Sequence, residues 1–553
     1  MVYIIDAVFE MEETWVMTTG DDPGQRAQNC DESGENMKIA KLRLAAGAAL
    51  FAGIAGMPAM LAAGPQLPLS LRSMPRIGEV DPRYQAYNID LIAITGMPQK
   101  TASAAAPSQG DEKVDTVMSG IKLEQPLDLY SPRLRKLARG LGPAYLRTSG
   151  TSANSVYFQN DDKPPLSTPP AGYNSVLTRG QWKGVVDFLH AVDARLLMSF
   201  TVNAAVRDAS GTWTPLQAKP LADYTRSIGG EIAAAELFNE PNLPNYGGAP
   251  KGYDGAWFAR DEAAFRTFAA AELPKMKIVG PGDVAVANIP LPGNLTGAQL
   301  MTGSPAPRFD VISYHFYPAV APRCAPANTP VGTSPELSMT DAWFRRTEKS
   351  LLDHKALRDR YAPGAPIWNT ETAGAACSGA PWSATFLDSF RYVDQLGRLA
   401  KLGADMVFHQ TLVGGNYGML EPETFAPRPN YWVAYLWKRL VGATVLDAGS
   451  SELGLHLYAQ CSPGRKGSVT LVAVNAGNDG KSLAVGAGAQ VYTLTAPELQ
   501  SKTVLLNGAR LGLGPKDALP HLAPRSVKDG NVALPATSIT FVQVAGAKNS
   551  ACY

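Results

Sequence analysis

The sequence is poor in the residue types and spacings that build metal centres. Its 553 residues include five cysteines and six histidines, which form no Cys-x-x-Cys or His-x-x-x-His pair. Structural zinc sites usually draw their ligands from such close pairs, so we expect no metal site and no cofactor. The chain also lacks internal repeats and a low-complexity body, and only 18% of its residues are charged. These absences exclude a repeat array and a disordered protein and leave an ordinary globular one.

A strong charge of one sign is also missing, since the formal net charge is +1. Residues 1–36 hold nine acidic residues and one basic residue, whereas from Gly64 onward 46 basic residues stand against 40 acidic ones. Such a modest positive excess suits an anionic partner, but it is also common in proteins that bind nothing charged. We expect no nucleic-acid partner.

The longest apolar run lies near the N-terminus. Residues 37–63 combine a basic start (Met37–Arg43), an apolar Ala/Gly-rich stretch (Leu44–Gly56) and small residues suited to cleavage. This pattern is typical of a signal peptide and predicts a secreted or periplasmic protein. The acidic residues 1–36 do not belong on such a signal, so we interpret them as a mis-assigned extension and Met37 as the true start. The alternative is an uncleaved membrane anchor, because the run approaches the roughly 20 residues that a span requires.

Export would place the few cysteines of the chain in an oxidising compartment. If Cys30 is removed with the leader, four cysteines remain, at positions 324, 377, 461 and 552. An even number of cysteines in an oxidising compartment favours disulfide bonds.

Between about Tyr87 and Leu412, eight strand-like apolar runs alternate with amphipathic helical stretches. The expected strands are Ala86–Ile94, Ala144–Thr148, Arg195–Val202, Ala235–Asn239, Lys277–Val279, Asp310–Phe316, Pro366–Thr370 and Asp405–Thr411. The expected helices include Gln181–Val192, Leu221–Glu231, Trp257–Ala271, Met339–Tyr361 and Ser383–Leu402. This alternation predicts an α/β fold, a parallel (β/α)8 TIM barrel over residues 86–440, with chemistry at the C-terminal ends of its strands.

The pattern changes after Gly442. Short alternating strands are expected at Leu455–Ala459, Ser468–Asn475, Gln490–Leu494, Thr503–Leu506 and Ser538–Val544. They predict a C-terminal antiparallel β-sandwich domain over residues 441–553. Residues 64–85, with a similar stretch at Ser70–Val80, are expected to join this sandwich. Ala102–Asp115 has the composition of a connection.

Two of the barrel runs end in a glutamate. The segment Leu237–Asn242 carries Glu240 after the fourth strand, and Ile367–Thr372 carries Glu371 at the seventh. Two facing carboxylic acids are what glycoside hydrolysis requires, because one protonates the leaving oxygen and the other attacks the anomeric carbon or activates water. As general acid Glu240 should be held protonated, and as nucleophile Glu371 should stay ionised about 5–5.5 Å away. The alternative for each is an ordinary turn or exposed loop glutamate.

Neighbouring residues fit the same chemistry. Asn239 is suited to bind the sugar 2-hydroxyl. The segment Tyr314–Pro318 ends the sixth strand, and its Tyr317 is suited to donate its hydroxyl to the nucleophile carboxylate. Tyr314 and Phe316 are core candidates, and we interpret His315 as a hydrogen-bonded wall residue rather than a catalyst.

Five segments resemble glycoside hydrolase family 79, the heparanase and β-glucuronidase group of retaining (β/α)8 enzymes. They are Ala144–Thr151, Asn239–Asn242, Tyr314–Tyr317, Glu371–Thr372 with Gly379–Pro381, and Gly415–Tyr417 with Pro429–Trp432 and Leu440–Gly442. The likeness covers the chain from about Tyr84 to its end. The first segment usually carries paired glycines in the family, and here Ser149 replaces one of them.

The resemblance implies Glu240 as acid/base and Glu371 as nucleophile. It also implies a glucuronide subsite lined by Asp90, Thr151, Asn239, Tyr317, Ser378, Gly379, Asn416 and Tyr417. Family members hold the uronate carboxylate partly through backbone amides after the nucleophile, in a loop where this chain has Cys377 and Ser378 before Gly379. By the same resemblance, Cys461 and Cys552 correspond to a disulfide between the sandwich and the C-terminus. For Cys324 and Cys377 we predict a second bridge, between the loops of the sixth and seventh strands.

Residues and resemblance together predict a retaining β-glucuronidase, foremost an endo-acting enzyme of heparanase type on heparan sulfate- or heparin-like chains. The alternatives are an exo-β-glucuronidase on other glycans, another retaining specificity such as xylosidase, and a non-catalytic glycan-binding protein. The expected partner is an anionic polysaccharide, and the chain is expected to act as a monomer in one piece. Five basic residues either contact sulfates or belong to a charged surface or a structural pair: Arg147, Lys183, Arg195, Arg207 and Lys219. Of these, we interpret Arg147, at a strand end, as a buried structural residue.

Overall fold

A computed structural model describes residues 66–96, 125–245, 248–290, 293–449 and 452–553. The predicted signal peptide, the extension before it and the connection at 102–115 lie outside the described residues. Within the described ranges, no helix combines the length and the apolar character needed to cross a bilayer.

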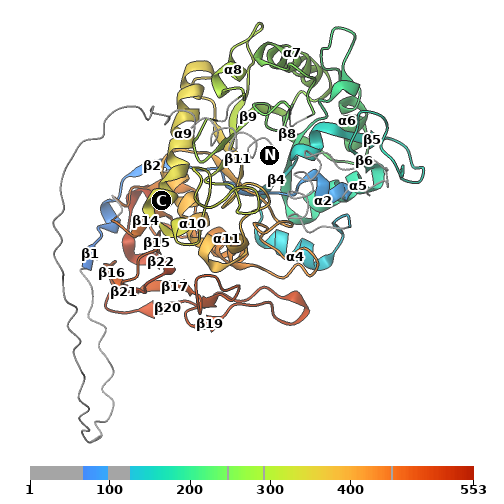
Figure 1. The fold of residues 1–553 in the computed structure, drawn as a ribbon. Coiled ribbons are helices and arrows are strands. Elements are labelled where there is room, and N and C mark those ends of the chain that lie inside the picture. The colour runs from blue at the N-terminus through green and yellow to red at the C-terminus, as the bar shows by residue number, and fades with distance from the viewer. Residues whose placement is uncertain (1–65, 97–124, 246–247, 291–292, 450–451) are drawn as a thin grey trace, which may run out of the picture.

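Eight parallel strands close into a barrel, as the alternation of strands and helices predicts (Figure 1). In spatial order they are β3 (Gln85–Asn88), β4 (Ala144–Thr148), β7 (Ala194–Ser199), β8 (Ile232–Glu236), β9 (Lys277–Val286), β10 (Val311–Tyr317), β11 (Ile367–Thr372) and β12 (Met406–His409). The barrel closes where Phe408 of β12 pairs with Ala86 of β3. The strand order follows the chain order, which is typical of a TIM barrel.

Helices follow the strands and cover the outside of the barrel. They are α2 (Leu91–Thr95), α4 (Pro132–Gly140), α5 (Arg179–Val192), α6 (Ala218–Ser227), α7 (Gly255–Glu272), α8 (Gly297–Met301), α9 (Asp341–Tyr361), α10 (Phe386–Lys401) and α11 (Pro429–Leu440). Local sequence sets some of these boundaries. At the start of α5, for example, Thr178 and Gln181 form a reciprocal capping box that satisfies the first backbone amides.

Alternation along the strands separates the two faces of the barrel wall. One residue or more from each strand points inward, and together they form a closed apolar layer of Ala86, Tyr145, Leu197, Ala234, Val279, Val311, Trp368, Met406 and Phe408. The alternate residues pack outward against the helices in the main core. A parallel sheet buried on both faces requires apolar runs, and this is why the strands were recognisable from sequence.

Several predicted strands end elsewhere than expected. Arg195–Val202 ends at Ser199, Asp405–Thr411 ends at His409, and Lys277–Val279 continues to Val286. Two more are too long at their C-terminal ends. The strand expected over Ala86–Ile94 stops at Asn88, and its last residues begin the short helix α2 instead. The strand expected over Ala235–Asn239 stops at Glu236. Glu240 has φ of +57°, a left-handed conformation that a strand cannot contain, so the chain must leave the sheet before it. Both departures occur where the chain turns into the loops above the barrel.

The C-terminal region forms a sheet of nine strands packed against a sheet of three. The larger sheet has the order β19-β18-β17-β22-β15-β14-β13-β2, with β20 paired to β17, and the smaller has the order β1-β16-β21. Their bounds are β1 (Gln66–Pro68), β2 (Arg76–Glu79), β13 (Thr444–Leu446), β14 (Leu455–Cys461), β15 (Val469–Asn475), β16 (Lys481–Ala484), β17 (Ala489–Thr495), β18 (Leu505–Leu506), β19 (Ala509–Arg510), β20 (Arg525–Val527), β21 (Asn531–Leu534) and β22 (Ser538–Val544). The N-terminal strand β2 pairs antiparallel with β13.

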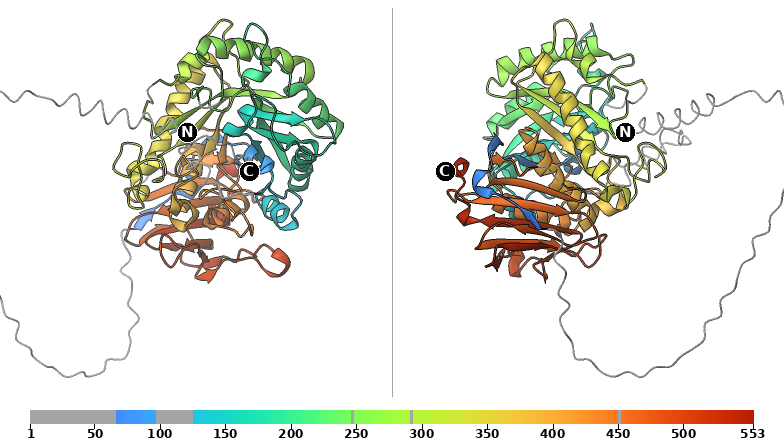
Figure 2. Two further views of the ribbon diagram at one scale, coloured as in Figure 1. Left: turned by 45° about the vertical axis from the view of Figure 1, so that its right-hand side comes forward. Right: turned by 90° about the vertical axis from the view of Figure 1, so that its left-hand side faces the viewer.

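The larger sheet is buried on both faces. Along β15, Leu471 and Ala473 face the smaller sheet, whereas Val472 and Val474 belong to the core shared with the barrel. Helices α10 and α11 lie between the barrel and this sheet (Figures 1 and 2). Gly397 permits the contact, because a Cβ there would stand 2.3 Å from the ring of Tyr458 on β14. Barrel and sandwich therefore share one continuous apolar core.

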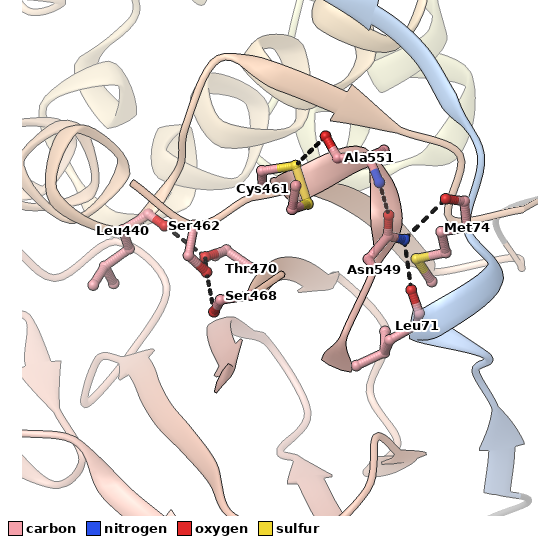
Figure 3. The surroundings of a disulfide bond; sticks show 10 residues. Leu71, Met74, Leu440, Cys461, Ser462, Ser468, Thr470, Asn549 and Ala551 are labelled. Carbon is pink, nitrogen blue, oxygen red and sulfur yellow. Dashed lines mark hydrogen bonds between the residues drawn. A yellow bond between two sulfur atoms is a disulfide. The ribbon is translucent and has the colours of Figure 1, made fainter. Parts of the chain in front are cut away.

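The C-terminal residues and the first described segment are tied into the sandwich (Figure 3). Cys461 at the end of β14 forms a disulfide with Cys552, the pairing that the resemblance implies. Beside it, the side-chain amide of Asn549 donates hydrogen bonds to the carbonyls of Leu71 (2.7 Å) and Met74 (2.9 Å). The C-terminal turn thus holds the N-terminal segment against the sandwich edge.

A buried cluster of charges joins β14 to the barrel helices. His456 on β14 lies between two carboxylates, with Nδ1 2.5 Å from Asp394 of α10 and Nε2 2.6 Å from Asp341 of α9. Arg398 pairs with Asp394 and with Glu348, and the Tyr458 hydroxyl also donates to Asp394. Both histidine nitrogens face carboxylates, so the ring must carry both protons to satisfy them.

We expect His456 to make interdomain stability depend on pH. Burial lowers the pKa of His456, but its hydrogen bonds with Asp394 and Asp341 raise it by more, so the net shift is upward. The stabilisation is then complete below the unfolded pKa of about 6.5 and is lost as pH rises through the folded pKa. His456→Asn should lower the free energy of unfolding by about 3 kcal/mol at pH 6 and by less at pH 9. Thermal unfolding at both pH values measures this.

The matched control is His190→Asn, which removes an exposed histidine on α5. It should change the melting temperature by little at either pH. An equal loss of stability at pH 6 and pH 9 in the His456 variant would contradict the assigned protonation.

Candidate active site

The C-terminal ends of the barrel strands bring the two predicted glutamates together. Glu371 lies within β11, and Glu240 lies four residues beyond the end of β8. One carboxylate oxygen of each, with a ring nitrogen of His315, all lie within 4.8 Å of one another. Both side chains are largely buried, at 14% exposure for Glu240 and 8% for Glu371. A single sugar ring can therefore contact both carboxylates.

Arg147 on β4 is the centre of the hydrogen-bond network beneath these acids. Its fully buried guanidinium donates to Glu236 (2.9 and 3.0 Å), to Glu371 (2.7 Å) and to the side-chain oxygen of Asn239 (2.8 Å). The hydroxyls of Ser313 and Thr370 donate hydrogen bonds to the other oxygen of Glu236. One cation thus fixes residues from β8 and β11 and the loop that carries Glu240.

The nucleophile candidate is held at both oxygens. Arg147 donates to Oε2 of Glu371, and the hydroxyl of Tyr317 donates to Oε1 at 2.5 Å. Tyr317 is the last residue of β10, so the contact joins neighbouring strands. Charge-assisted hydrogen bonds of this kind leave the carboxylate one orientation.

His315 contacts the acid/base candidate. Its Nε2 lies 3.0 Å from the Arg147 guanidinium, which can only donate, so Nε2 accepts and the proton sits on Nδ1. Nδ1 then donates to Glu240 Oε1 at 3.1 Å. His315 is therefore a buried wall residue, as expected, and it also touches the reacting carboxylate.

The surroundings of Glu240 do not raise its pKa, as its expected role of general acid would require. Burial raises the pKa of Glu240, but the hydrogen bond from His315 and the charge of Arg147 bring it below the ordinary value. The sequence could not reveal this, because His315 arrives from a strand 75 residues away. Glu240 also adopts φ of +57°, an unfavourable conformation for a non-glycine residue that the loop imposes.

Among the described residues, Glu240, His315 and Glu371 also form a group whose ligand atoms lie close enough together to hold a metal ion. The guanidinium of Arg147 lies against Glu371 and His315, however. A positive charge at that distance disfavours a second cation. The donor set is better suited to hydrogen bonding with a sugar.

Asp90 and Thr151, two of the residues predicted to line the glucuronide subsite, lie beside each other. A Cβ at Gly150, the residue before Thr151, would stand 3.1 Å from Asp90 Oδ1. Asp90 Oδ2 accepts from Gln410 at 2.7 Å, whereas Oδ1 is buried without a hydrogen-bond partner among the described residues. Burial and the charge of Glu371 raise the pKa of Asp90 to about 7.

The loop after Glu371 forms a backbone cradle. Cys377, Ser378 and Gly379 all have φ between +61° and +81°, so three successive residues turn left-handed. Tyr417 packs against Gly379, where a Cβ would stand 2.8 Å from its amide, and Asn416 donates to the Gly379 carbonyl. Among the described residues, nothing accepts a hydrogen bond from the amides of Gly379 and Ala380. These two amides are available to an anionic ligand.

A second disulfide fixes this cradle. Cys324 in the loop after β10 is bonded to Cys377, the bridge predicted between the sixth and seventh strand loops. Backbone hydrogen bonds of Ala321 and Ala376 lie alongside it. The two loops therefore act as one unit.

Sequence reasoning missed Glu236, Gln410 and Asn154, and it underrated Arg147. Asn154 exchanges two hydrogen bonds with the backbone of Asn239. Glu236 stands four residues before Glu240, at the end of the same strand-like run, and this was a possible signal in the sequence. Its hydrogen-bond partners are far away in the chain, however, and a local pattern cannot assign them. Arg147 is fully buried and paired with Glu236 and Glu371, which confirms its interpretation as a buried structural residue. Lys183, Arg207 and Lys219 are each paired with carboxylates, and Arg195 lies at the opposite end of β7 from the site.

Curated proteins of similar sequence act on glucuronides. Heparanase of Mus musculus is 29% identical over 490 residues, which cover 77% of this chain and 88% of that protein. Hyaluronoglucuronidase of Hirudo nipponia is 28% identical over 471 residues, covering 77% and 92%. Baicalin-beta-D-glucuronidase of Scutellaria baicalensis is 32% identical over 219 residues, covering 38% and 41%. No family model matches the chain.

The fold also recurs among solved structures. A 4-O-alpha-L-rhamnosyl-beta-D-glucuronidase from Fusarium oxysporum superposes with a TM-score of 0.56 at 14% identity, over 86% of this chain and 100% of that one. At this identity the likeness concerns the fold alone.

We expect Asp90 to make substrate affinity fall above neutral pH. With a pKa of about 7, Asp90 gains a negative charge there, and this charge repels an anionic sugar. The KM for an anionic glycoside should rise several-fold between pH 6 and pH 8 in the wild type and stay nearly constant in Asp90→Asn. Steady-state kinetics across this range measure the difference. The control is Asp162→Asn, an exposed acid that follows strand β5 (Val156–Gln159), which should keep the wild-type profile.

Proposed function

We propose that this heparanase-like glycoside hydrolase cleaves β-glucuronidic linkages by double displacement and retains the anomeric configuration. The spacing of the carboxylates carries the proposal, since oxygens of Glu240 and Glu371 lie within 4.8 Å. Retaining enzymes space their carboxylates by about 5–5.5 Å, whereas inverting enzymes need about 6.5–9.5 Å to admit a water.

In the first step Glu371 attacks the anomeric carbon while Glu240 protonates the leaving oxygen. The C–O bond to the leaving group breaks and a covalent glycosyl–Glu371 ester forms. Arg147 and Tyr317 hold both oxygens of Glu371 for in-line attack. In the second step Glu240 takes a proton from water, whose oxygen displaces Glu371 from the sugar.

Glu240 must be protonated for the first step and ionised for the second. The low pKa that His315 gives it suits the second step. A bound glucuronate brings a negative charge and displaces water, and both raise the pKa of a nearby carboxyl. Substrate binding therefore prepares the acid. Formation of the neutral Glu371 ester removes a negative charge beside Glu240 and prepares the base.

Recognition of the uronate is assigned to the cradle after the nucleophile. The amides of Gly379 and Ala380 are suited to bind the carboxylate, with Ser378, Asn416 and Tyr417 shaping that side. Asp90 and Thr151 are assigned to sugar hydroxyls opposite, because Asp90 Oδ1 is buried and unpaired within the described residues. Asn239, fixed by Arg147, is assigned to the 2-hydroxyl.

The substrate proposed first is a heparan sulfate-type chain cut internally by a secreted or periplasmic enzyme. The alternative is exo-cleavage of terminal glucuronate from other glycans. Two disulfides favour an oxidising compartment. A non-catalytic glycan-binding role is disfavoured, because both carboxylates and their orienting partners are in place.

The charge around the site favours sparsely sulfated segments of such a chain. The described loops that follow the barrel strands carry five basic residues and nine acidic ones. The basic ones are Lys163, Arg207, Lys251, Arg323 and Arg428, and the acidic ones are Asp90, Asp161, Asp162, Asp208, Glu240, Asp254, Glu336, Glu421 and Glu423. Arg207 and Arg428 are paired with carboxylates. A densely sulfated chain requires many free cations, and these loops offer few of them. The excess of basic residues in the described part of the chain lies away from this face.

Substituting either carboxylate should stop the reaction at a different step. Glu371→Gln should lower kcat by at least about 10³-fold on any glucuronide, because no nucleophile remains. Glu240→Gln should do so with poor leaving groups, and less with a nitrophenyl leaving group that needs no protonation. The anomer first formed by the wild type, followed by NMR, should be β. Unchanged turnover in either variant, or an α-product, would refute the mechanism.

Sulfation should reduce cleavage rather than promote it. We expect the unsulfated glucuronate–N-acetylglucosamine backbone to be cut at least about as fast as heparan sulfate, and heparin much more slowly. Asp162→Lys with Glu423→Lys should raise the rate on sulfated chains, whereas Glu231→Lys with Asp479→Lys, away from this face, should not. Product sizing gives the rates and also separates internal from terminal cleavage. Fastest cleavage of heparin by the wild type would contradict the charge argument.

A further inference from the structure

Arg323 lies at the uronate cradle without being part of it. It belongs to the loop after β10, and its guanidinium donates to the carbonyl of Gly379. Asn416 donates to the same carbonyl at 3.2 Å. The next residue, Cys324, is bonded to Cys377 two residues before Gly379. The loop pair that the disulfide joins therefore fixes the guanidinium beside the backbone assigned to the carboxylate.

The charge of Arg323 is not neutralised within the described residues. The four fully buried arginines are each paired with a carboxylate: Arg147 with Glu236 and Glu371, Arg391 with Asp388, Arg398 with Asp394, and Arg428 with Glu421. Arg323 is half-buried, yet no described carboxylate lies within ion-pair distance of it. Burial accordingly lowers its pKa. A half-buried cation without a counter-ion in the protein is open to an anion supplied from outside the chain.

Donors of Arg323 are left over for such an anion. Only one terminal nitrogen is engaged, with Gly379, and no described residue accepts from its other N–H groups. Tyr417 packs against the same Gly379 whose carbonyl accepts from Arg323. The loop 373–385 itself contains no Lys or Arg. For a carboxylate on the Gly379 and Ala380 amides, Arg323 is a cation without a carboxylate partner among the described residues, and it is already hydrogen-bonded to the backbone of this loop.

We propose that Arg323 is a specificity-determining residue that pairs with the carboxylate of the bound uronate and so selects glucuronides over neutral glycosides. The inference rests on the proposed function, because it assumes that a uronate occupies this cradle. Guanidinium and carboxylate form charge-assisted hydrogen bonds, which a neutral sugar cannot replace. The backbone amides then orient the carboxylate, and Arg323 supplies the charge that distinguishes it from a hydroxymethyl group or an ester.

The test compares a nitrophenyl β-glucuronide with its uncharged methyl ester in wild type and Arg323→Gln. For the glucuronide, kcat/KM should fall about 10- to 100-fold, mainly through KM, since one hydrogen-bonded charge contact is lost. For the ester it should change by less than about threefold, so the preference for the charged sugar collapses. Where ester turnover is slow, its Ki against the glucuronide gives the affinity. Arg323→Lys should recover part of the preference, because it restores the charge but not the fork.

Arg346→Gln is the matched control. Arg346 is also half-buried without a described carboxylate partner, but it lies on α9, donates to the Pro318 carbonyl and stacks on Trp343 at 5.0 Å. Its loss should affect both substrates equally and show mainly in thermal unfolding. Equal losses on both substrates in Arg323→Gln would overturn the proposal. A wild type that cleaves no glucuronide would instead overturn the proposed function itself.

Discussion

One buried guanidinium organises the catalytic end of this barrel. Arg147 binds Glu236, Glu371, Asn239 and His315, which come from three other strands or the loops that follow them. Removing such a cation would leave buried carboxylates without a partner, a cost of several kcal/mol. Burying this single cation has a desolvation cost, but the same cation fixes the positions of all the side chains that it contacts.

The same network gives the two glutamates different tasks. Glu371 accepts from Arg147 and Tyr317, so both of its oxygens are engaged. Glu240 is held through His315 alone and is more exposed, so a leaving-group oxygen can reach it. In the proposed mechanism, these different donors suit Glu371 to be the nucleophile and Glu240 to be the proton carrier.

Around this core, charge is distributed sparingly. The catalytic face has more acids than bases, and its cations are mostly paired within the protein. A disulfide and a half-buried arginine join the two loops next to the nucleophile. This arrangement suits recognition of one carboxylate at a defined place better than attraction of a polyanion along its length.

The sequence alone determined the barrel, because strands buried on both faces must be apolar runs and therefore stand out between helices. It also predicted Glu240 and Glu371 as a facing pair of carboxylates, whose oxygens the closed barrel brings within 4.8 Å, and it predicted the antiparallel domain. The sequence did not predict that β3 ends at Asn88 and β8 at Glu236, because the loops above the barrel determine where the chain leaves these strands.

Only the tertiary structure decided the electrostatics. The pKa of Glu240 depends on His315, and that of Asp90 depends on burial and on Glu371, groups separated by 75 and 281 positions in the chain. The roles of Arg147 and Arg323 likewise follow from which carboxylates lie near each guanidinium. A pattern of residues records local conformation and burial, whereas the interaction between charges depends on distances that exist only once the barrel has closed.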